Sequence, residues 1–287
     1  MTDKFIKKMF GTSELPTIEF NSEDVSQKAQ ELTGKLSISG VQPKLSMKMD
    51  KKKNTLIPVA KEGEYILKPQ LTTFPNIPEN EQCCMDIAAQ FKIDVPLHCL
   101  IPLKDERLAY IVKRFDRKSG IKIHQEDFSQ ILGLDKYTGS VEQIGRKLKE
   151  ISAAPGYDTQ LFFERVLFNF MIGNGDAHLK NYSIAYEDKD IIRLTPAYDI
   201  VCSKLVIQDE EDSALTINGR KNKLGRENFD KLADYLNVPI KIRYEKFSGN
   251  LGLMETIIKT SRINAQNQIK FIDIIKERLD RLELPEK

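Results

Sequence analysis

The sequence predicts an α+β fold of two lobes, because strand signals fill the first part of the 287-residue chain and helix signals fill the second. Short alternating or apolar runs bounded by Pro, Gly and Asn precede Asp116, which is typical of β-strands. After the polar segment Asp116–Gly120, longer stretches with helical spacing prevail. We therefore expect a strand-rich lobe over residues 1–117 and a helical lobe over 118–287, with the ligand site between them.

In the first part, Leu45–Met49 alternates between apolar and polar residues with a period of two, as a half-buried strand does. A second strand, Tyr65–Lys68, ends at Pro69, because proline cannot donate to a strand ladder. The pattern further predicts helices over Ser22–Leu32, with Ser22 as N-cap, and over Pro78–Phe91, and strands over Leu97–Leu103 and Leu108–Arg114.

In the second part, Asp158 is a candidate N-cap for an apolar helix that runs to Ile172. Two strand-like runs, Tyr182–Tyr186 and Ile191–Thr195, flank an acidic turn. Four further helices are expected over Ser140–Ala153, Arg226–Leu236, Tyr244–Ser261 and Ile263–Leu282.

The composition excludes several classes of protein. Lys+Arg 44 against Asp+Glu 42 leaves a net charge of +2, so no general field draws the chain to nucleic acid or to a membrane. The apolar runs are too short to span a bilayer. Four cysteines lack a C-x-x-C pattern or a histidine at zinc spacing, and we expect free or buried thiols in a reducing cytoplasm.

The most informative segment is Gly173-Asn174-Gly175-Asp176, which follows the apolar helix. Asn181 stands at the fifth position after Asp176, and Asp199 follows beyond the two strand-like runs. Kinase-type sites space a base and two magnesium ligands in this way, so Asp176 is the candidate base and Asn181 and Asp199 are the candidate metal ligands. Alone, the segment is as well explained by an Asn-Gly turn. His178 and Lys180 are expected to support the loop, although His178 is also compatible with a structural role.

Other candidate residues lie in the first part. Lys68 at a strand end could bind nucleotide phosphates if a carboxylate held it, with Glu81 as the first candidate partner and Glu79 as the alternative. A plain surface lysine is the competing interpretation. The backbone of Lys113 to Phe115 could contact adenine, and the loop around Gly40 could cradle phosphates. An ordinary connector and an ordinary polar loop explain these two segments almost equally well.

Together these residues resemble the HipA-like serine/threonine kinases, the toxin half of a bacterial toxin–antitoxin system. The resemblance runs from about Ser37 to Leu236 and is carried by several motifs at once. These motifs are Ser37-Ile38-Ser39-Gly40, Tyr65-Ile66-Leu67-Lys68-Pro69, Asn80-Glu81, Lys113-Arg114-Phe115-Asp116-Arg117, His124-Gln125-Glu126-Asp127, Gly173 to Asn181 and Pro196-Ala197-Tyr198-Asp199.

The resemblance implies a two-lobed protein-kinase-like fold, ATP with Mg²⁺, and phosphorylation of a protein hydroxyl, for example on an aminoacyl-tRNA synthetase. Only a short segment precedes the Gly-rich loop, as in the HipT form, in which the missing subdomain is a separate small protein. Antitoxin proteins are the implied partners, and no direct contact with nucleic acid or membrane is expected. A small-molecule kinase of the aminoglycoside type and a catalytically inactive nucleotide-binding scaffold are the alternatives.

The resemblance also implies autophosphorylation of Ser37 and Ser39. A phosphate there adds about −1.5 to −2 charges where nucleotide phosphates belong, and we expect it to antagonise nucleotide binding or to reshape the loop. Mass spectrometry after incubation with Mg-ATP should find phosphate on this loop, and Ser37→Ala and Ser39→Ala should remove it. A chain that stays unmodified in this experiment contradicts the prediction.

Overall fold

The computed structural model describes residues 2–33, 43–70, 74–118, 120–188 and 191–285. The chain divides into two compact units, and each is described by itself. The first unit comprises Met1–Gln82 and Pro96–Ile121, and the second comprises Cys83–Val95 and Lys122–Lys287. The lobe boundary at residue 117 stays a prediction. Ser37, Ser39 and Gly40 lie outside the described residues.

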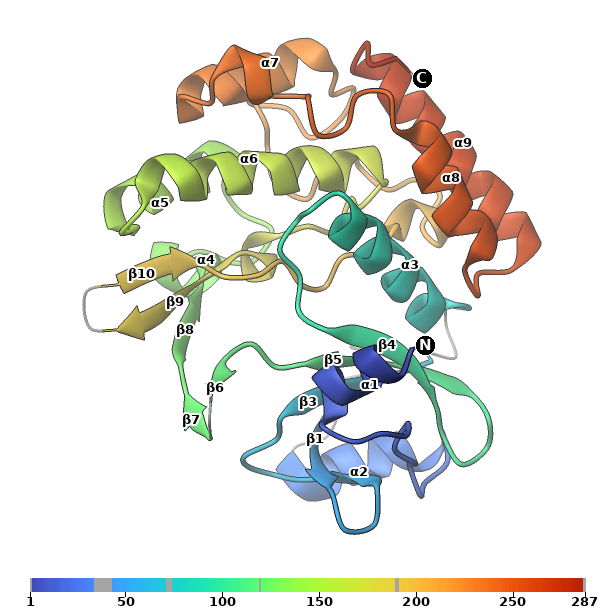
Figure 1. The fold of residues 1–287 in the computed structure, drawn as a ribbon. Coiled ribbons are helices and arrows are strands. Elements are labelled where there is room, and N and C mark those ends of the chain that lie inside the picture. Colours follow the sequence, from blue (N-terminus) through green and yellow to red (C-terminus); the bar gives the residue numbers. More distant parts are fainter. Residues whose placement is uncertain (1, 34–42, 71–73, 119, 189–190, 286–287) are drawn as a thin grey trace. The chain divides into compact units, whose positions relative to one another are not determined.

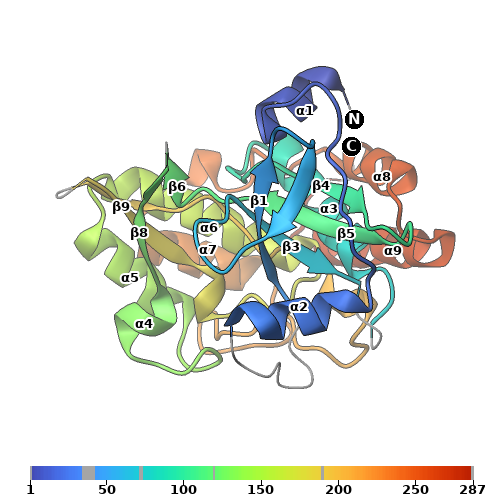
Figure 2. The same ribbon diagram turned by 90° about the horizontal axis from the view of Figure 1, so that it is seen from below.

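The first unit is built on a five-stranded antiparallel sheet with the strand order β2-β1-β3-β5-β4. Strands β1, β3 and β5 lie side by side in Figure 2. The burial of β1 alternates strictly, with Leu45, Met47 and Met49 buried, which confirms the strand predicted from the period of two. The elements are α1 (Asp3–Phe10), α2 (Asp24–Thr33), β1 (Leu45–Asp50), β2 (Thr55–Pro58), β3 (Tyr65–Pro69), β4 (His98–Pro102) and β5 (Leu108–Lys113).

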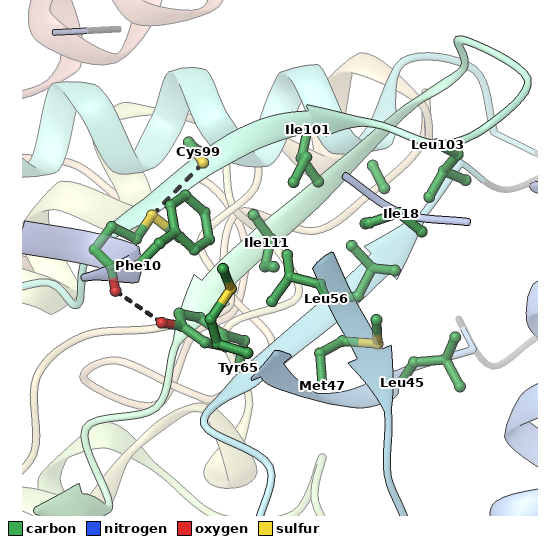
Figure 3. Close-up of a cluster of buried hydrophobic side chains, with 14 of the residues drawn as sticks. Phe10, Ile18, Leu45, Met47, Leu56, Tyr65, Cys99, Ile101, Leu103 and Ile111 are labelled. Atoms are coloured by element: carbon green, nitrogen blue, oxygen red, sulfur yellow. Dashed lines mark hydrogen bonds between the residues drawn. The ribbon is translucent and has the colours of Figure 1, made fainter. Parts of the chain in front are cut away.

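An apolar core joins α1 to this sheet (Figure 3). The ring centroids of Phe10 and Tyr65 are 5.4 Å apart, and the Tyr65 hydroxyl donates to the Met9 carbonyl oxygen at 2.8 Å. The sequence pattern missed α1, although Thr2 caps its start and Gly11, with φ of 75°, ends it. Its apolar residues Ile6, Met9 and Phe10 are all buried in this core.

Three elements connect or bridge the units in sequence. Helix α3 (Ile77–Gln90) begins in the first unit and ends in the second, and the short strands β6 (Arg117–Lys118) and β7 (Ile121–Lys122) form a two-stranded ribbon. In the second unit, the end of this helical region places Phe91 against Phe247, with ring centroids 5.6 Å apart. The predicted helix over Pro78–Phe91 is therefore confirmed within one residue at each end.

The second unit surrounds α6 (Pro155–Met171), most of which is buried (Figure 1). This helix contacts α5, α7, α9 and β10. A three-stranded antiparallel sheet has the order β10-β9-β8. The remaining elements are β8 (His124–Asp127), α4 (Phe128–Leu132), α5 (Val141–Ile151), η1 (Leu179–Asn181), β9 (Ser183–Asp188), β10 (Ile191–Leu194), η2 (Ser203–Leu205), α7 (Arg226–Leu236), η3 (Ile240–Ile242), α8 (Leu251–Thr260) and α9 (Ala265–Arg281).

Three local predictions were wrong. Helix α2 begins at Asp24, because the Ser22 hydroxyl donates to Asp105 at 2.6 Å instead of capping it. Helix α6 begins at Pro155, so Asp158 lies inside it and not at its N-cap. Helix α8 begins only at Leu251, after the short turn η3.

The four cysteines are buried thiols, as expected. Among the helices of the described ranges, none has the length and apolarity needed to cross a bilayer.

Asp158 has a structural role that yields a testable prediction. Its fully buried carboxylate accepts hydrogen bonds from Arg193 at 2.9 Å, from the Ser152 hydroxyl at 2.6 Å and from the Leu194 amide at 3.0 Å. Burial acts to raise its pKa, but these donors prevail and lower it. The carboxylate therefore stabilises the fold above the unfolded pKa of about 3.9, and this stabilisation is lost as the pH falls through the lower folded value.

We expect Asp158→Asn to lower the free energy of unfolding by about 2–4 kcal/mol near neutral pH, since Arg193 loses its partner. Urea denaturation measures this, and the difference from wild type should shrink below about pH 4. As a control, Glu150→Gln removes an exposed pair with Lys147 and should change stability by less than about 1 kcal/mol. Equal losses in the two variants would refute the assigned role of Asp158.

Candidate functional site

The segment Gly173–Asp176 forms the turn that leaves α6, and two of its residues must be glycine. Gly173 has φ of 70°, and a Cβ there would lie 2.8 Å from the Ile274 side chain. A Cβ on Gly175 would lie 2.3 Å from the Glu211 carbonyl oxygen. The close approach of two distant segments therefore requires the glycines, which leaves Asp176 as the exposed residue of this buried turn.

A small network of hydrogen bonds closes the loop from Asp176 to Asn181. The His178 amide donates to the Asp176 carbonyl oxygen at 2.8 Å and to the Asn181 Oδ1 at 3.0 Å. The Asn181 amide donates back to the His178 carbonyl oxygen at 2.9 Å. These hydrogen bonds hold Asn181 in the short 3₁₀ helix η1, close to the turn that carries Asp176.

The hairpin of β9 and β10 brings Asp199 back to this loop. Asn181 precedes β9 and Asp199 follows β10, and these strands pair antiparallel with Ile184 opposite Leu194. The Tyr198 hydroxyl then donates to the Lys180 carbonyl oxygen at 2.9 Å. An antiparallel pair joins residues before its first strand to residues after its second, so the two predicted metal ligands lie on adjoining segments.

Asp199 has a backbone conformation that calls for an explanation. Its φ of 59° lies in the left-handed region, which costs an L-residue roughly 1–2 kcal/mol. Such conformations concentrate at functional sites, where surrounding contacts hold them. The hydroxyl of the neighbouring Tyr198 holds the adjoining backbone through its hydrogen bond to the Lys180 carbonyl oxygen.

The imidazole of His178 lies within the influence of both acidic residues. Burial lowers its pKa, while the Asp176 and Asp199 carboxylates act in the opposite direction. Both carboxylates thus oppose the effect of burial on the pKa of this one ring. The Lys180 side chain is exposed.

The carboxyl group of Glu210 also lies beside the turn. The sequence pattern did not identify this residue. The Ser203 hydroxyl donates to Glu210 Oε2 at 2.5 Å and accepts from the Gly175 amide at 2.9 Å. Burial raises the pKa of Glu210 to about 7, and the Asp176 charge adds to this effect. The acidic run 209–212 was the available signal, but only the tertiary contacts distinguish Glu210 within it.

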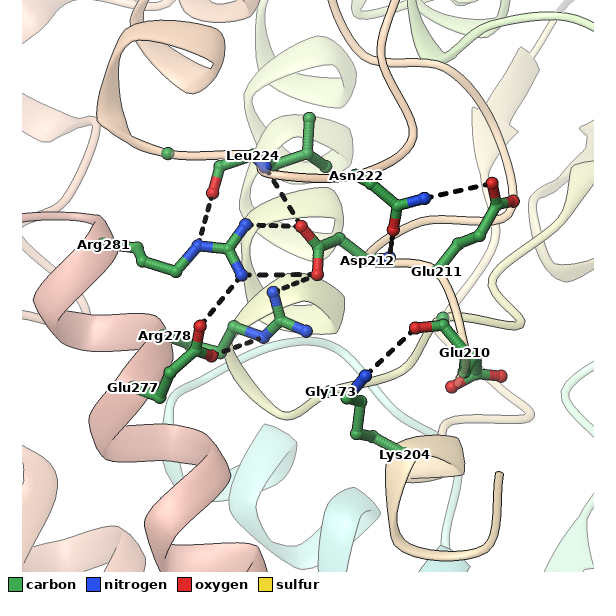
Figure 4. Close-up of polar contacts among 12 residues, drawn as sticks. Gly173, Lys204, Glu210, Glu211, Asp212, Asn222, Leu224, Glu277, Arg278 and Arg281 are labelled. Carbon is green, nitrogen blue, oxygen red and sulfur yellow. Dashed lines mark hydrogen bonds and ion pairs between the residues drawn. The ribbon is translucent and has the colours of Figure 1, made fainter. Parts of the chain in front are cut away.

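The C-terminal helix α9 anchors the segment that carries Glu210 (Figure 4). The buried carboxylate of Asp212 is paired with the guanidinium groups of Arg278 and Arg281, and it also accepts from the Leu224 amide at 3.0 Å. Arg281 donates in turn to the Leu224 carbonyl oxygen at 2.8 Å. The packing of the Gly173–Gly175 turn therefore depends on two arginines more than one hundred positions further along the chain.

The donor set fits magnesium only in part. Asn181 and Asp199 offer the oxygen atoms that Mg²⁺ prefers. No group of three His, Cys, Asp or Glu side chains within the described ranges could hold a metal ion by itself. Mg²⁺ in such sites takes one or two carboxylates together with substrate phosphates and water, so the residues fit a metal that arrives with a nucleotide.

In the first unit, Lys68 forms a buried ion pair with Glu81. Lys68 Nζ lies 2.6 Å from Glu81 Oε1, and the side chains are 5% and 2% exposed. The ammonium group also lies 5.6 Å from the centre of the Tyr110 ring. Glu81, the first candidate partner, thus pairs with Lys68. Because Lys68 is buried, the interpretation as a plain surface lysine is excluded. Its nucleotide-binding role stays a prediction.

The segment Lys113–Phe115 is already engaged within the first unit. The Lys113 amide donates to the Leu97 carbonyl oxygen and the Arg114 amide to the Glu64 carbonyl oxygen, both at 2.8 Å. The Lys113 ammonium donates to the Met9 carbonyl oxygen at 2.9 Å, and burial lowers its pKa. These two amides would have to leave their acceptors to bind adenine, so the contact predicted for this segment stays a prediction.

Comparisons with known proteins identify the family of the chain. The family model of the HipA-like C-terminal domain matches residues 36–266. "Putative kinase Y4dM" of Sinorhizobium fredii is 35% identical over 218 residues, which are 69% of this chain and 52% of that protein. The serine/threonine-protein kinase toxin HipA of Shewanella oneidensis is 26% identical over 208 residues, covering 64% of this chain and 47% of the toxin. The chain thus spans about half the length of these curated relatives.

Two solved structures share the fold. One belongs to the complex of HipA, HipB and operator DNA from the Shewanella oneidensis MR-1 toxin–antitoxin system, with a TM-score of 0.74 at 20% identity, covering 93% of this chain and 72% of that one. The other is the proinflammatory kinase CtkA of Helicobacter pylori, with a TM-score of 0.57 at 13% identity, covering 76% of this chain and 85% of that one. The predicted α+β, kinase-like fold is confirmed.

The raised pKa of Glu210 yields a prediction about stability. Since its folded value of about 7 exceeds the unfolded value of about 4.3, the protonated carboxyl favours the fold. This contribution is complete below the unfolded pKa and is lost as the pH rises through 7. Glu210 should therefore contribute a decrease to the wild-type melting temperature as the pH is raised through this range. The Glu210→Gln variant should lack this decrease.

Thermal melts between pH 5 and pH 8 measure this difference. Glu211→Gln is the matched control, because Glu211 neighbours Glu210 but is largely exposed and pairs with Lys221 at 3.7 Å. This control should retain the wild-type pH dependence. An unchanged pH dependence in Glu210→Gln would rule out a neutral carboxyl at this position.

Proposed function

The chain belongs to the HipA-like C-terminal domain family, and on this basis we propose that it is an ATP-dependent serine/threonine protein kinase. The convergence of Asp176, Asn181 and Asp199 around one loop of the second unit carries this proposal. The spacing of these residues is that of a base and two metal ligands in phosphoryl transfer. The kinase names of the curated relatives support the same class of reaction.

Asp176 is the proposed base. Its exposed carboxylate can accept the proton of an incoming hydroxyl, while its backbone stays in the turn that Gly173 and Gly175 permit. The hydroxyl oxygen then bonds to the γ-phosphorus as the bond from that phosphorus to the ADP oxygen breaks. Proton transfer by a positioned side chain contributes about 10²–10⁴-fold to such reactions.

Asn181 and Asp199 are the proposed ligands of Mg²⁺. Bound there, the ion would neutralise charge that develops on the nucleotide phosphates. The hydrogen bond from the His178 amide orients the Asn181 side chain, and the left-handed backbone of Asp199 is held beside Tyr198. The hydrogen bond from the His178 amide thus supports the proposed role of Asn181 as an oxygen donor.

Lys68 is proposed to bind the α- and β-phosphates, with Glu81 holding it. Breaking one partner of a buried ion pair costs about 3–5 kcal/mol, so the pair keeps the ammonium group in one place. A lysine held in this way presents a preorganised charge to an anion. The loop around Gly40 and the segment Lys113–Phe115 complete the proposed nucleotide-binding residues.

We further propose that the kinase acts in the cytoplasm as the toxin of a toxin–antitoxin system. The serine/threonine-protein kinase toxin HipA of Shewanella oneidensis supports this, as does the likeness to the structure of HipA with HipB and DNA. A translation component such as an aminoacyl-tRNA synthetase is the proposed substrate. Antitoxin proteins are the proposed partners, including a small protein equivalent to the subdomain that the longer form contains.

The proposal is tested by replacing the base. We expect Asp176→Asn to lower ADP formation from Mg-ATP, and phosphate transfer to protein, by at least about 10²-fold. Binding of ATP should persist, because the amide has the same size and the other proposed ligands remain. Asp273→Asn, at an exposed position of α9, is the control and should retain wild-type rates.

Three outcomes separate the alternatives. Phosphorylation of proteins in a lysate by wild type but not by Asp176→Asn supports the protein kinase. Transfer to small alcohols but not to protein favours the small-molecule kinase. Equal growth arrest by wild type and Asp176→Asn, without measurable transfer, favours the inactive scaffold.

A further inference from the structure

Tyr137 contacts the proposed base directly. Its hydroxyl donates a hydrogen bond to Asp176 Oδ1 at 2.8 Å. The two residues lie 39 positions apart in sequence, so the contact comes from the fold and not from a local turn. Both side chains are exposed, with Tyr137 at 47%, and solvent or a substrate can therefore reach the rest of the carboxylate.

The tyrosine is itself held by the loop that it contacts. The Leu179 amide donates to the Lys136 carbonyl oxygen at 3.0 Å, which fixes the backbone beside Tyr137 to η1. The edge of the Tyr137 ring meets the His178 ring, with centroids 5.1 Å apart and planes at 77°. Lys136 Nζ lies 4.5 Å from the centre of the Tyr137 ring. The half-exposed phenol therefore has a defined position.

The protonation state of the phenol suits a donor. Burial raises the pKa of Tyr137 to about 12, and the hydrogen bond to Asp176 and the charges of Asp176 and Glu210 act in the same direction. The hydroxyl thus remains protonated at neutral pH. A carboxylate acceptor makes such a bond stronger and more directional than one between neutral groups.

We propose that Tyr137 is a positioning residue for the kinase reaction, which orients the Asp176 carboxylate by holding Oδ1 and leaves Oδ2 to accept the proton of the substrate hydroxyl. This inference rests on the proposed function. An exposed aspartate without such a contact rotates among several orientations, and only some of them present an oxygen to the acceptor. Misplacement by about 1 Å can cost about 10²-fold in rate.

The competing interpretation is that Tyr137 occupies the place of the substrate hydroxyl and inhibits the site. The two interpretations predict opposite results for Tyr137→Phe, which removes the hydroxyl and keeps the ring against His178. A positioning residue is needed for turnover, so the variant slows it. An inhibitory residue blocks the base, so the variant speeds turnover.

The kinetic test measures ADP formation from Mg-ATP, together with phosphate incorporation into the chain. For Tyr137→Phe we expect kcat to fall about 10- to 100-fold with the KM for ATP unchanged. In the Asp176→Asn background the same change should have no further effect, since the group to be oriented is gone. Tyr157→Phe, at a 57% exposed tyrosine, is the matched control and should keep the wild-type kcat.

A second measurement tests the contact without turnover. With ¹³C-labelled tyrosine, the NMR titration of Tyr137 should have its midpoint near pH 12, and Asp176→Asn should lower this pKa. A Tyr137 titration that does not change in Asp176→Asn overturns the proposal, because the bond is then absent in solution.

The kinetic outcomes are equally decisive. An unchanged or higher kcat in Tyr137→Phe, or an equal further loss in the Asp176→Asn background, overturns the positioning role. If wild type and Asp176→Asn form ADP at the same rate, the proposed function fails, and the positioning role fails with it. That result is distinct from an active, Asp176-dependent enzyme that tolerates Tyr137→Phe, in which only the present inference fails.

Discussion

The close approach of the Gly173–Gly175 turn to the segment 203–212 is the constraint on which the candidate site of the second unit depends. The Gly175 amide is bound by Ser203, and a Cβ at Gly175 would collide with the Glu211 backbone. This packing fixes the chain on one side of Asp176. On its other side, the hydrogen bonds of His178 with Asn181 hold the loop closed. The residues on both sides of Asp176 are buried, while Asp176 itself remains exposed.

The segment 203–212 has little regular structure of its own, so it needs an anchor. The anchor is the buried carboxylate of Asp212, which pairs with Arg278 and Arg281 of α9. Breaking one partner of a buried ion pair is costly, which explains how a helix that carries none of the proposed catalytic residues can still determine the geometry of the site. Glu210 is carried on the same segment, and its raised pKa is a consequence of that burial.

Much of the fold could be predicted, because the relevant signals are local. The alternation in β1 and the apolar spacing of α3 identified both elements. The predictions failed where a distant partner competed with a local one. Ser22 binds Asp105 instead of capping α2. Asp158 lies inside α6 and binds Arg193 of β10 instead of capping the helix. The sequence pattern did not predict helix α1, because its apolar residues are buried by contacts with the distant sheet.

The sequence by itself determined the residue types and spacings on which the proposed chemistry of the candidate site rests, because Asp176, Asn181 and Asp199 lie within short segments. It also identified Lys68 and its partner Glu81, since a strand followed by a helix is a short-range arrangement. Only the tertiary structure decided which other groups surround the base. Tyr137 and Glu210 reach Asp176 from 39 and 34 positions away, and no local pattern encodes which loops fold against one another. That choice is made by packing and by buried charge pairs, which depend on the whole chain.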